Sequence, residues 1–273
     1  MLSVESKEVI RATLPAVGGA IGDITPLFYE KLFAAAPDLE RNLFNRGNQQ
    51  GQQQKALAGA IATFATLQVE PDQDKIDATV SRIANKHASL GVAAESYDVV
   101  HKYLFEAIVE VLGEAVTPEV AAAWDELYWL FARTLIAAEA GLYEAAGVSA
   151  GDVWRGAVVS ARSGSEDRVS FTLAAADGSP LPDFQPGQYI SVAAQLPDGA
   201  RQIRQYPLDT VTTDGVWAFT VRRVADSTLE DGTPSLRGEV SNFLIDHVSE
   251  GAELTVSLPF GGPVTADGVA ATA

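Results

Sequence analysis

The chain contains no cysteine, which excludes disulfides, thiolate metal sites, iron–sulfur clusters and cysteine nucleophiles. Histidine is scarce too, and His87, His101 and His247 are the only imidazoles. Basic residues are few, because 19 Lys and Arg stand against 36 Asp and Glu and give a net charge of -17. This balance argues against a surface that follows nucleic-acid phosphates, and it favours solubility.

Long apolar runs are missing as well. The most apolar stretch, 127–138, is interrupted by Arg133 and flanked by Glu126 and Glu139, so it is too short and too charged to span a bilayer. The N-terminal residues are too charged for a signal peptide. We therefore expect a soluble, cytoplasmic protein without a membrane span.

Length and composition predict two folded domains. A chain of 273 residues exceeds the size at which a single core usually stops growing, and 47% hydrophobic with 20% charged residues is ordinary globular usage. The hydrophobic pattern changes from helical spacing to alternation between about Gly147 and Asp152. We therefore place a first domain at residues 1–148 and a second at residues 149–273.

The first domain has helical hydrophobic spacing throughout. A loose apolar stripe ends near Gly18–Gly19, and Thr25–Pro26 has the cap and first-turn proline of a new helix. Further helices are expected at residues 72–86, 95–113 and 117–147. The pattern predicts an all-α domain.

A polar run at residues 45–54 has the composition of a loop. Gln53 is nevertheless in phase with Leu57, Ile61 and Phe64 of the helix that follows, which places it on the apolar side of that helix. A polar group there is expected to face a pocket, because burial of an unpaired polar group costs free energy.

The second domain has the pattern of short strands. Apolar and polar residues alternate at 169–173 and 217–221, and one short helix is expected at 241–248. Turn signals recur at Asp177–Gly178, Pro186–Gly187, Pro197–Asp198–Gly199, Asp214–Gly215 and Asp231–Gly232. Many short strands at such spacing predict an antiparallel barrel or sandwich.

His87 lies within the segment 83–90, before a fresh helix start near Glu95. Taken alone, a helical histidine is compatible with a structural role or with a role as a ligand. A neutral imidazole is a suitable axial donor to haem iron, since it leaves the opposite side of the iron open to a diatomic gas. The residues around His87 must decide between the two interpretations.

The first half carries a set of motif residues in order, namely Tyr29, Phe44–Asn45, Gln53, Leu57, Lys86–His87, Tyr97 and Glu139. With this motif it resembles the globin domain of flavohaemoglobins over essentially all of residues 1–147. The resemblance implies that His87 binds the iron of haem b, with Lys86 beside it in the cofactor site. It further implies that Glu139, neighboured by Tyr97, accepts a hydrogen bond from the imidazole and increases electron density on iron.

The same resemblance assigns the opposite side of the haem. Tyr29 is expected to donate a hydrogen bond to bound oxygen with help from Gln53, so that both are catalytic together with Tyr97 and Glu139. Leu57 is expected to crowd the ligand and Phe44 to pack on the porphyrin edge. His101 and His247 have no place in the motif, and His101 is interpreted as structural.

The second half carries three matching segments, at 184–189, 203–208 and 238–244. They resemble the FAD-binding barrel of the ferredoxin-reductase group, and the fold implied for the whole chain is an all-α globin domain followed by a Greek-key antiparallel β-barrel. Arg204 and Tyr206 lie two apart on a strand, so both side chains share one face, where a guanidinium can neutralise the FAD pyrophosphate beside the tyrosine. The expected FAD-binding residues are Tyr189, Arg204, Gln205, Tyr206, Pro207, Gly238, Val240 and Ser241.

Pro207 departs from the family pattern, which usually has Ser or Thr at this position. Proline offers neither a hydroxyl nor an N–H to flavin N5, so FAD binding is expected more than ordinary flavin reactivity. Neither Gly18–Gly19 nor Gly261–Gly262 forms a dinucleotide fingerprint, so the sequence shows no place for NAD(P)H. We expect NAD(P)H to serve as electron donor only if a further domain or a reductase partner supplies its site.

The resemblance implies a nitric oxide dioxygenase, in which O2 and NO give nitrate at haem and FAD re-reduces ferric iron. One alternative is a gas-binding or haem-sensor globin whose second domain is a docking or electron-accepting platform. A further alternative is a flavin reductase fragment that keeps its globin only for folding. Uptake of FAD together with haem distinguishes the dioxygenase from the sensor.

Overall fold

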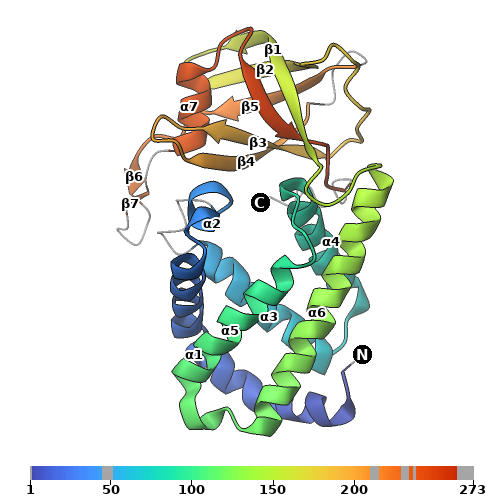
Figure 1. Ribbon diagram of the computed structural model, residues 1–273, viewed down its shortest axis with the longest axis vertical. Coiled ribbons are helices and arrows are strands. Elements are labelled where there is room, and N and C mark those ends of the chain that lie inside the picture. The colour runs from blue at the N-terminus through green and yellow to red at the C-terminus, as the bar shows by residue number, and fades with distance from the viewer. Residues whose placement is uncertain (1, 45–51, 210–214, 229–233, 236–237, 263–273) are drawn as a thin grey trace. The chain divides into compact units, whose positions relative to one another are not determined.

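The computed structural model describes residues 2–44, 52–209, 215–228, 234–235 and 238–262. The chain forms two compact units (Figure 1). The first unit comprises residues 1–40, 46–84 and 92–142, and the second comprises residues 41–45, 85–91 and 143–273. The last part of the helix that carries His87 therefore belongs to the second unit.

The first part of the chain is helical. Its elements are α1 (Val4–Ala35), α2 (Pro37–Asn42), α3 (Gln52–Val69), α4 (Gln73–Leu90), α5 (Ser96–Leu112), the 3-10 helix η2 (Gly113–Ala115) and α6 (Pro118–Ala145). Ser3 caps α1 by accepting a 3.1 Å hydrogen bond from the Ser6 N–H. Helix α1 packs on α3 and α5, and Ile10, Ile24 and Leu32 are buried on its inner side. The helices expected at residues 72–86, 95–113 and 117–147 are confirmed as α4, α5 and α6.

Helix α1 is continuous, so the predicted break at Gly18–Gly19 and the new start at Thr25–Pro26 are wrong. The Thr25 hydroxyl donates to the Ile21 carbonyl at 2.9 Å within the helix instead of capping a new one. Interior glycine costs about 1 kcal/mol and interior proline about 3 kcal/mol relative to alanine. Burial on both sides of the segment, by Val17 and Phe28, offsets such costs.

The second unit is built on an antiparallel barrel. Its strands are β1 (Trp154–Gly164), β2 (Arg168–Ala175), β3 (Tyr189–Gln195), β4 (Arg201–Pro207), β5 (Trp217–Arg222), β6 (Ser227–Thr228), β7 (Pro234–Ser235) and β8 (Glu253–Ser257). The main sheet has the order β4-β3-β8-β1-β2-β5, and a bridge between Leu208 and Phe219 joins its two ends. Helix α7 (Glu239–His247) confirms the short helix expected near 241–248.

Alternation on the strands decides which residues form the barrel core. Trp217, Phe219 and Val221 of β5 are buried, and Phe219 stacks on Phe171 with ring centroids 5.4 Å apart. Successive side chains on a strand point to opposite faces, so Thr220 lies on the other face of β5. The predicted barrel is therefore confirmed, and its outer face is available for a ligand.

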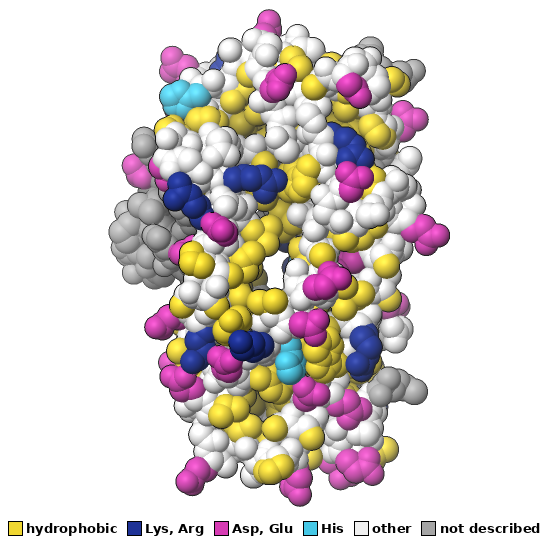
Figure 2. Space-filling view, viewed as in Figure 1, with side chains coloured by type: hydrophobic (Ala, Val, Ile, Leu, Met, Phe, Trp, Pro, Cys, Tyr) yellow, Lys and Arg dark blue, Asp and Glu magenta, His cyan; other side chains and the backbone are white. Residues whose placement is uncertain are grey.

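Acidic side chains are spread over the visible surface and do not gather in one patch (Figure 2). This distribution fits the net charge of -17. Within the described part of the chain, no helix combines the length and the hydrophobicity needed to cross a membrane.

Candidate functional site

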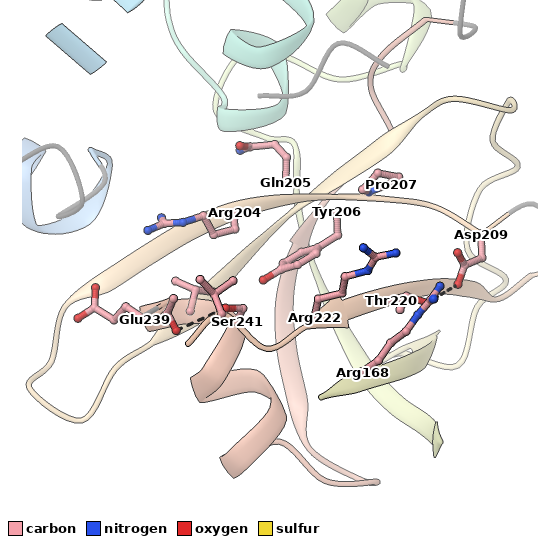
Figure 3. A pocket seen from close by; sticks show the side chains of 13 residues that line it. Arg168, Arg204, Gln205, Tyr206, Pro207, Asp209, Thr220, Arg222, Glu239 and Ser241 are labelled. Carbon is pink, nitrogen blue, oxygen red and sulfur yellow. Dashed lines mark hydrogen bonds between the residues drawn. The ribbon is translucent and has the colours of Figure 1, made fainter. Parts of the chain in front are cut away.

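A cavity of about 510 Å³ opens on the second unit between β4, β5 and the start of α7 (Figure 3). It is lined by Arg168, Arg204, Gln205, Tyr206, Pro207, Asp209, Thr220, Arg222, Val224, Gly238, Glu239, Val240 and Ser241. The structure thus brings together seven of the eight residues that the sequence predicts for FAD. The eighth, Tyr189, does not line this cavity and lies next to it, opposite Pro207 in the β3–β4 register.

Strand β4 supplies the charged and aromatic side chains of the cavity. The Tyr206 ring points from β4 toward the start of α7 and packs against Phe219, with centroids 5.2 Å apart. Burial raises the pKa of Tyr206, so its phenol stays protonated at neutral pH. Burial also lowers the pKa of the Arg204 guanidinium, while Tyr206 and Glu239 oppose this shift. Arginine nevertheless stays cationic, so Arg204 presents a positive charge to the cavity.

The start of α7 provides backbone donors at the same cavity. Gly238 precedes the helix without a side-chain cap, and a Cβ there would collide with Ser241 and Val224. Glycine is therefore required at this close approach of loop and strand. The first N–H groups of a helix have no partner within it and attract anions, so the start of α7 is a suitable phosphate site.

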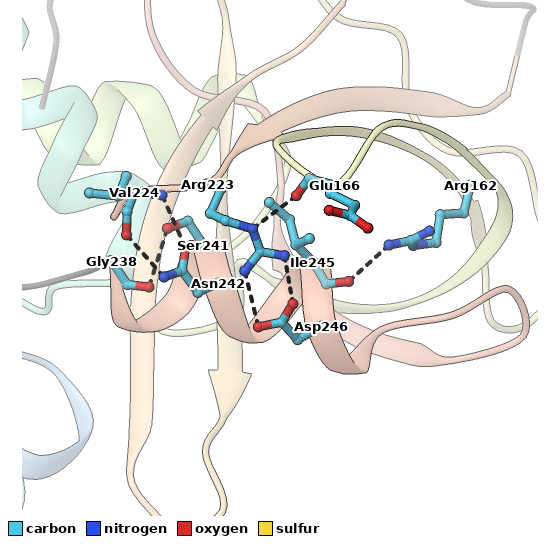
Figure 4. A network of polar contacts seen from close by, with 9 residues as sticks. All are labelled: Arg162, Glu166, Arg223, Val224, Gly238, Ser241, Asn242, Ile245 and Asp246. Atoms are coloured by element: carbon cyan, nitrogen blue, oxygen red, sulfur yellow. Dashed lines mark hydrogen bonds and ion pairs between the residues drawn. The ribbon is translucent and has the colours of Figure 1, made fainter. Parts of the chain in front are cut away.

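Side chains on α7 fix the position of this loop (Figure 4). The Asn242 amide forms two hydrogen bonds of 3.0 Å with the backbone of Val224, one to its N–H and one to its carbonyl. The Gly238 N–H donates to the same carbonyl at 2.9 Å. Arg223 binds both carboxylate oxygens of Asp246 at 2.6 and 3.2 Å, and its Nε donates to the Glu166 carbonyl at 2.9 Å.

Sequence reasoning missed the outer end of the cavity, formed by Arg168, Asp209, Thr220 and Arg222. Arg168 stands opposite Arg222 across the β2–β5 pair, and Thr220 donates to Asp209 at 3.2 Å. The alternation of β5 carried the signal, because polar Thr220 and Arg222 follow the buried positions of that strand one by one. Only the cavity shows that this outward face belongs to a site.

Pro207 ends β4, is exposed, and lines the cavity. Its neighbour Leu208 donates its N–H to the Gln188 carbonyl at 2.9 Å, so the strand pairing continues past the proline. Burial raises the pKa of Tyr189 to about 12, against a smaller opposite effect of a hydrogen bond with Ser89. The expected absence of a donor at position 207 therefore holds for the backbone as well as for the side chain.

In the helical unit, Tyr97 and Glu139 lie together as expected. Glu139 is only 2% exposed, and its carboxylate accepts a 2.6 Å hydrogen bond from the Tyr97 hydroxyl. Tyr128 in turn donates to the Tyr97 carbonyl at 2.6 Å. A buried carboxylate held by a tyrosine is a suitable second partner for a ligand imidazole.

Tyr29 is buried on α1 between Phe28 and Phe33, at centroid distances of 4.7 and 5.5 Å. Burial raises its pKa, so the phenol keeps its proton and can donate. Leu57 is half-buried on α3, whereas the side chain of Gln53 lies outside the described residues.

Three further predicted positions fall in the second unit. Lys86 and His87 lie in the last turns of α4, where Ser89 donates its hydroxyl to the Lys86 carbonyl at 2.8 Å. Phe44 is half-buried, and its carbonyl accepts from the Gln202 amide at 3.3 Å. No contact in the second unit tests whether these residues hold a haem, so their roles stay predictions.

His101 has surroundings that explain it without a cofactor. Its ring stacks on Phe105 at a centroid distance of 4.4 Å and also lies near Tyr128 and Trp129. Its Nε2 is 2.7 Å from the Asp125 carboxylate. These contacts fit the structural role expected for it.

Comparison with known proteins agrees with both units. Residues 27–135 match the globin family. The chain is 39% identical over 266 residues to a flavohemoprotein of Rhizobium meliloti (strain 1021), which covers 96% of this chain and 64% of that protein. It is 41% identical over 268 residues to the flavohemoprotein of Bordetella pertussis (strain Tohama I), with the same coverage of 96% and 64%.

A solved structure extends this similarity to the fold. The crystal structure of the flavohemoglobin from Malassezia yamatoensis, with bound FAD and heme, matches with a TM-score of 0.83 and 37% identity. The match covers 96% of this chain and 65% of that one. The helical unit and the barrel therefore define a globin joined to a reductase-type FAD-binding domain. The chain belongs to the flavohaemoglobin family, and it spans 64% of the length of the first curated relatives that it matches.

Proposed function

We propose that this chain binds haem and FAD and carries the oxygen chemistry of a flavohaemoglobin-type nitric oxide dioxygenase. The overall reaction converts NO and O2 to nitrate at haem, with re-reduction by the flavin. The observation that carries the proposal is the cavity in which Arg204, Tyr206 and the start of α7 converge. The Malassezia yamatoensis flavohemoglobin, with its bound FAD and heme, supports the same assignment.

The cavity residues fit FAD by charge and by shape. Arg204 and the first N–H groups of α7 are suited to the pyrophosphate, and Gly238 leaves room for its approach. Tyr206 and Tyr189 are placed on adjacent strands to pack against the isoalloxazine. Gln205, Pro207, Val240 and Ser241 complete the proposed set.

The haem site is proposed from the family motif and from the local chemistry of each residue. His87 would bind the iron, and the Tyr97–Glu139 pair would fix the imidazole by accepting its second N–H. On the oxygen side, Tyr29 would donate its phenol proton, helped by Gln53. Leu57, Phe44 and Lys86 would complete the pocket. When bound, haem supplies oxygen activation and FAD supplies the electrons, whereas the protein orients both and excludes water.

Three wider expectations belong to the same proposal. We place the domain boundary at 148/149, within the turns that follow α6. The protein would work in the cytoplasm on O2 and NO. Electrons would reach the flavin from NAD(P)H through a reductase partner or a further nicotinamide-binding domain.

Optical spectroscopy tests the proposal directly. The purified chain, supplied with haem and FAD, should show a Soret band and flavin absorbance together, and after photoreduction it should consume NO and O2 with formation of nitrate. His87→Ala should lose stoichiometric haem because no other axial donor is proposed, whereas the exposed His247→Ala should retain it. A chain that takes up haem but no FAD would instead favour the gas-sensing alternative.

A further inference from the structure

A chain of buried hydrogen bonds crosses the second unit from the FAD cavity to helix α4. Gln205 lines the cavity, and its amide donates to the Ser191 hydroxyl at 3.0 Å. Ser191 donates in turn to the Ser89 hydroxyl at 2.9 Å. Ser89 donates to the Lys86 carbonyl at 2.8 Å, which is the peptide group bonded to the nitrogen of His87.

The end of α4 has one side that contacts the barrel within the second unit. Asn85 and Ser89 are four residues apart, so they share a face of the helix. The Asn85 carbonyl oxygen accepts a 2.7 Å hydrogen bond from the Gly261 N–H, as Ser89 accepts from Ser191. His87 is two residues from each, which places it about 200° around the helix on the opposite side. The last turns of α4 therefore act as a short rigid spacer between the barrel and the imidazole.

Burial makes this chain specific in geometry. Ser89 and Ser191 are both 0% exposed, so each hydroxyl must be paired within the protein. The backbone of Ser191 is fixed separately, because its N–H donates to the Ser257 hydroxyl at 2.9 Å and Ser257 donates to the Leu258 carbonyl at 2.7 Å. Ser191 can therefore serve Gln205 and Ser89 only from one position.

We propose that Ser89 and Ser191 are positioning residues that hold the His87 turn of α4 in register with Gln205 in the flavin cavity. The inference rests on the proposed function and adds to it how the two cofactor sites are kept in a fixed relation. In the step concerned, the reduced flavin is oxidised by one electron and releases a proton to solvent, while ferric iron is reduced to ferrous. The serines take no part in that chemistry, and they fix the geometry in which it occurs.

The test uses the full chain loaded with haem and FAD. Flash photoreduction of the flavin should be followed by electron transfer to ferric haem, and Ser191→Ala should slow this step about tenfold or more, since small displacements have large effects on reaction rates. Its FAD affinity and Soret spectrum should stay within about twofold of wild type. Ser89→Ala removes the same hydrogen bond from the helix side and should give the same result, which covers the case that Ser191→Ala does not fold.

Ser257→Ala is the matched control. It removes a hydroxyl that is equally buried, at 0% exposure, but leaves the Gln205–Ser191–Ser89 chain intact. It should lower stability without slowing electron transfer, and equal slowing in all three variants would overturn the positioning role.

Amide hydrogen exchange gives a readout that does not depend on activity. Binding of FAD to the haem-loaded wild type should slow exchange at residues 86–91, and this protection should be lost in Ser191→Ala. Wild-type transfer with unchanged rates and unchanged protection in both serine variants would overturn the inference alone. A wild type that binds FAD but shows no flavin-to-haem transfer would overturn the proposed function and the inference with it.

Discussion

Tyr29 and Tyr128 are two buried phenols of the helical unit for which different tasks follow from the structure. The Tyr128 hydroxyl donates to the Tyr97 carbonyl at 2.6 Å, so it holds α6 to α5. Tyr29 lies on α1, and burial keeps it protonated by raising its pKa. In the proposed site its proton is donated to bound oxygen.

Replacement of Tyr29 by Phe should therefore accelerate oxygen release. A hydrogen bond to a charged or strongly polarised acceptor contributes about 1.5–3 kcal/mol, which corresponds to a roughly 10- to 100-fold faster off-rate when it is lost. Stopped-flow displacement of oxygen by carbon monoxide measures this rate. Tyr128→Phe is the control, which should lose stability but keep the wild-type off-rate. An unchanged rate in Tyr29→Phe would mean that its hydroxyl does not reach the ligand.

At this scale the sequence predicts residues whose side chains carry a recognisable motif. Tyr97 and Glu139 are 42 positions apart and were nevertheless expected as neighbours, which the structure confirms. The pair Ser89 and Ser191 was not expected. Serine is common and has no motif of its own, so only its complete burial and its partner reveal its task.

Helix α7 is the element that makes the barrel a candidate nucleotide site. Its start is held by two kinds of contact, the Asn242 amide on the Val224 backbone and the Arg223–Asp246 ion pair. The side chains of that ion pair are 28% and 46% exposed, and such surface pairs contribute only about 0.2–1 kcal/mol. The amide pairing acts directly beside Gly238 and therefore has more influence on the cavity.

We predict that Asn242→Ala weakens FAD binding about five- to tenfold, because loss of a net hydrogen bond of about 1 kcal/mol lets the start of α7 move away from the cavity. Fluorescence titration of the apoprotein with FAD measures the change. Asp246→Asn should change FAD affinity less than twofold. If the two variants weaken binding equally, the loop is held by the helix as a whole and not by the Asn242 amide.

Elements with a strong period were predictable, and those decided by packing were not. Alternation at Trp217, Phe219 and Val221 gives β5 because period-two burial has no helical counterpart. The expected break at Gly18–Gly19 failed because helix breakers act through local propensity, which burial along the rest of α1 outweighs. The outward residues of β5 share a cavity with α7 only through the barrel closure, which no local pattern contains.

For the whole molecule, four buried tyrosines make stability sensitive to alkali. Burial raises the pKa of Tyr29 and Tyr128 in the helical unit and of Tyr189 and Tyr206 in the barrel unit, with Tyr189 reaching about 12. In the unfolded chain a tyrosine titrates near pH 10. Above that pH the unfolded chain releases protons that the folded protein retains, so alkali favours unfolding.

The free energy of unfolding should therefore be insensitive to these groups below about pH 10 and should fall above it by up to about 1.4 kcal/mol per pH unit for each tyrosine. For Tyr189 this loss ends as the pH passes its folded pKa of about 12. Urea unfolding at pH 9, 10.5 and 11.5, followed separately in the far-UV and by tyrosine absorbance, measures the slope. Tyr29→Phe should reduce the slope for the helical unit by one tyrosine's share and leave the barrel unit unaffected. Because the variant removes a hydroxyl as well as a titration, its constant effect on stability is read between pH 7 and 9, where no tyrosine contributes a slope. A slope above pH 10 that matches wild type would show that Tyr29 ionises in the folded protein as readily as in the unfolded chain, and its phenol would then not be the protected donor that the oxygen site requires.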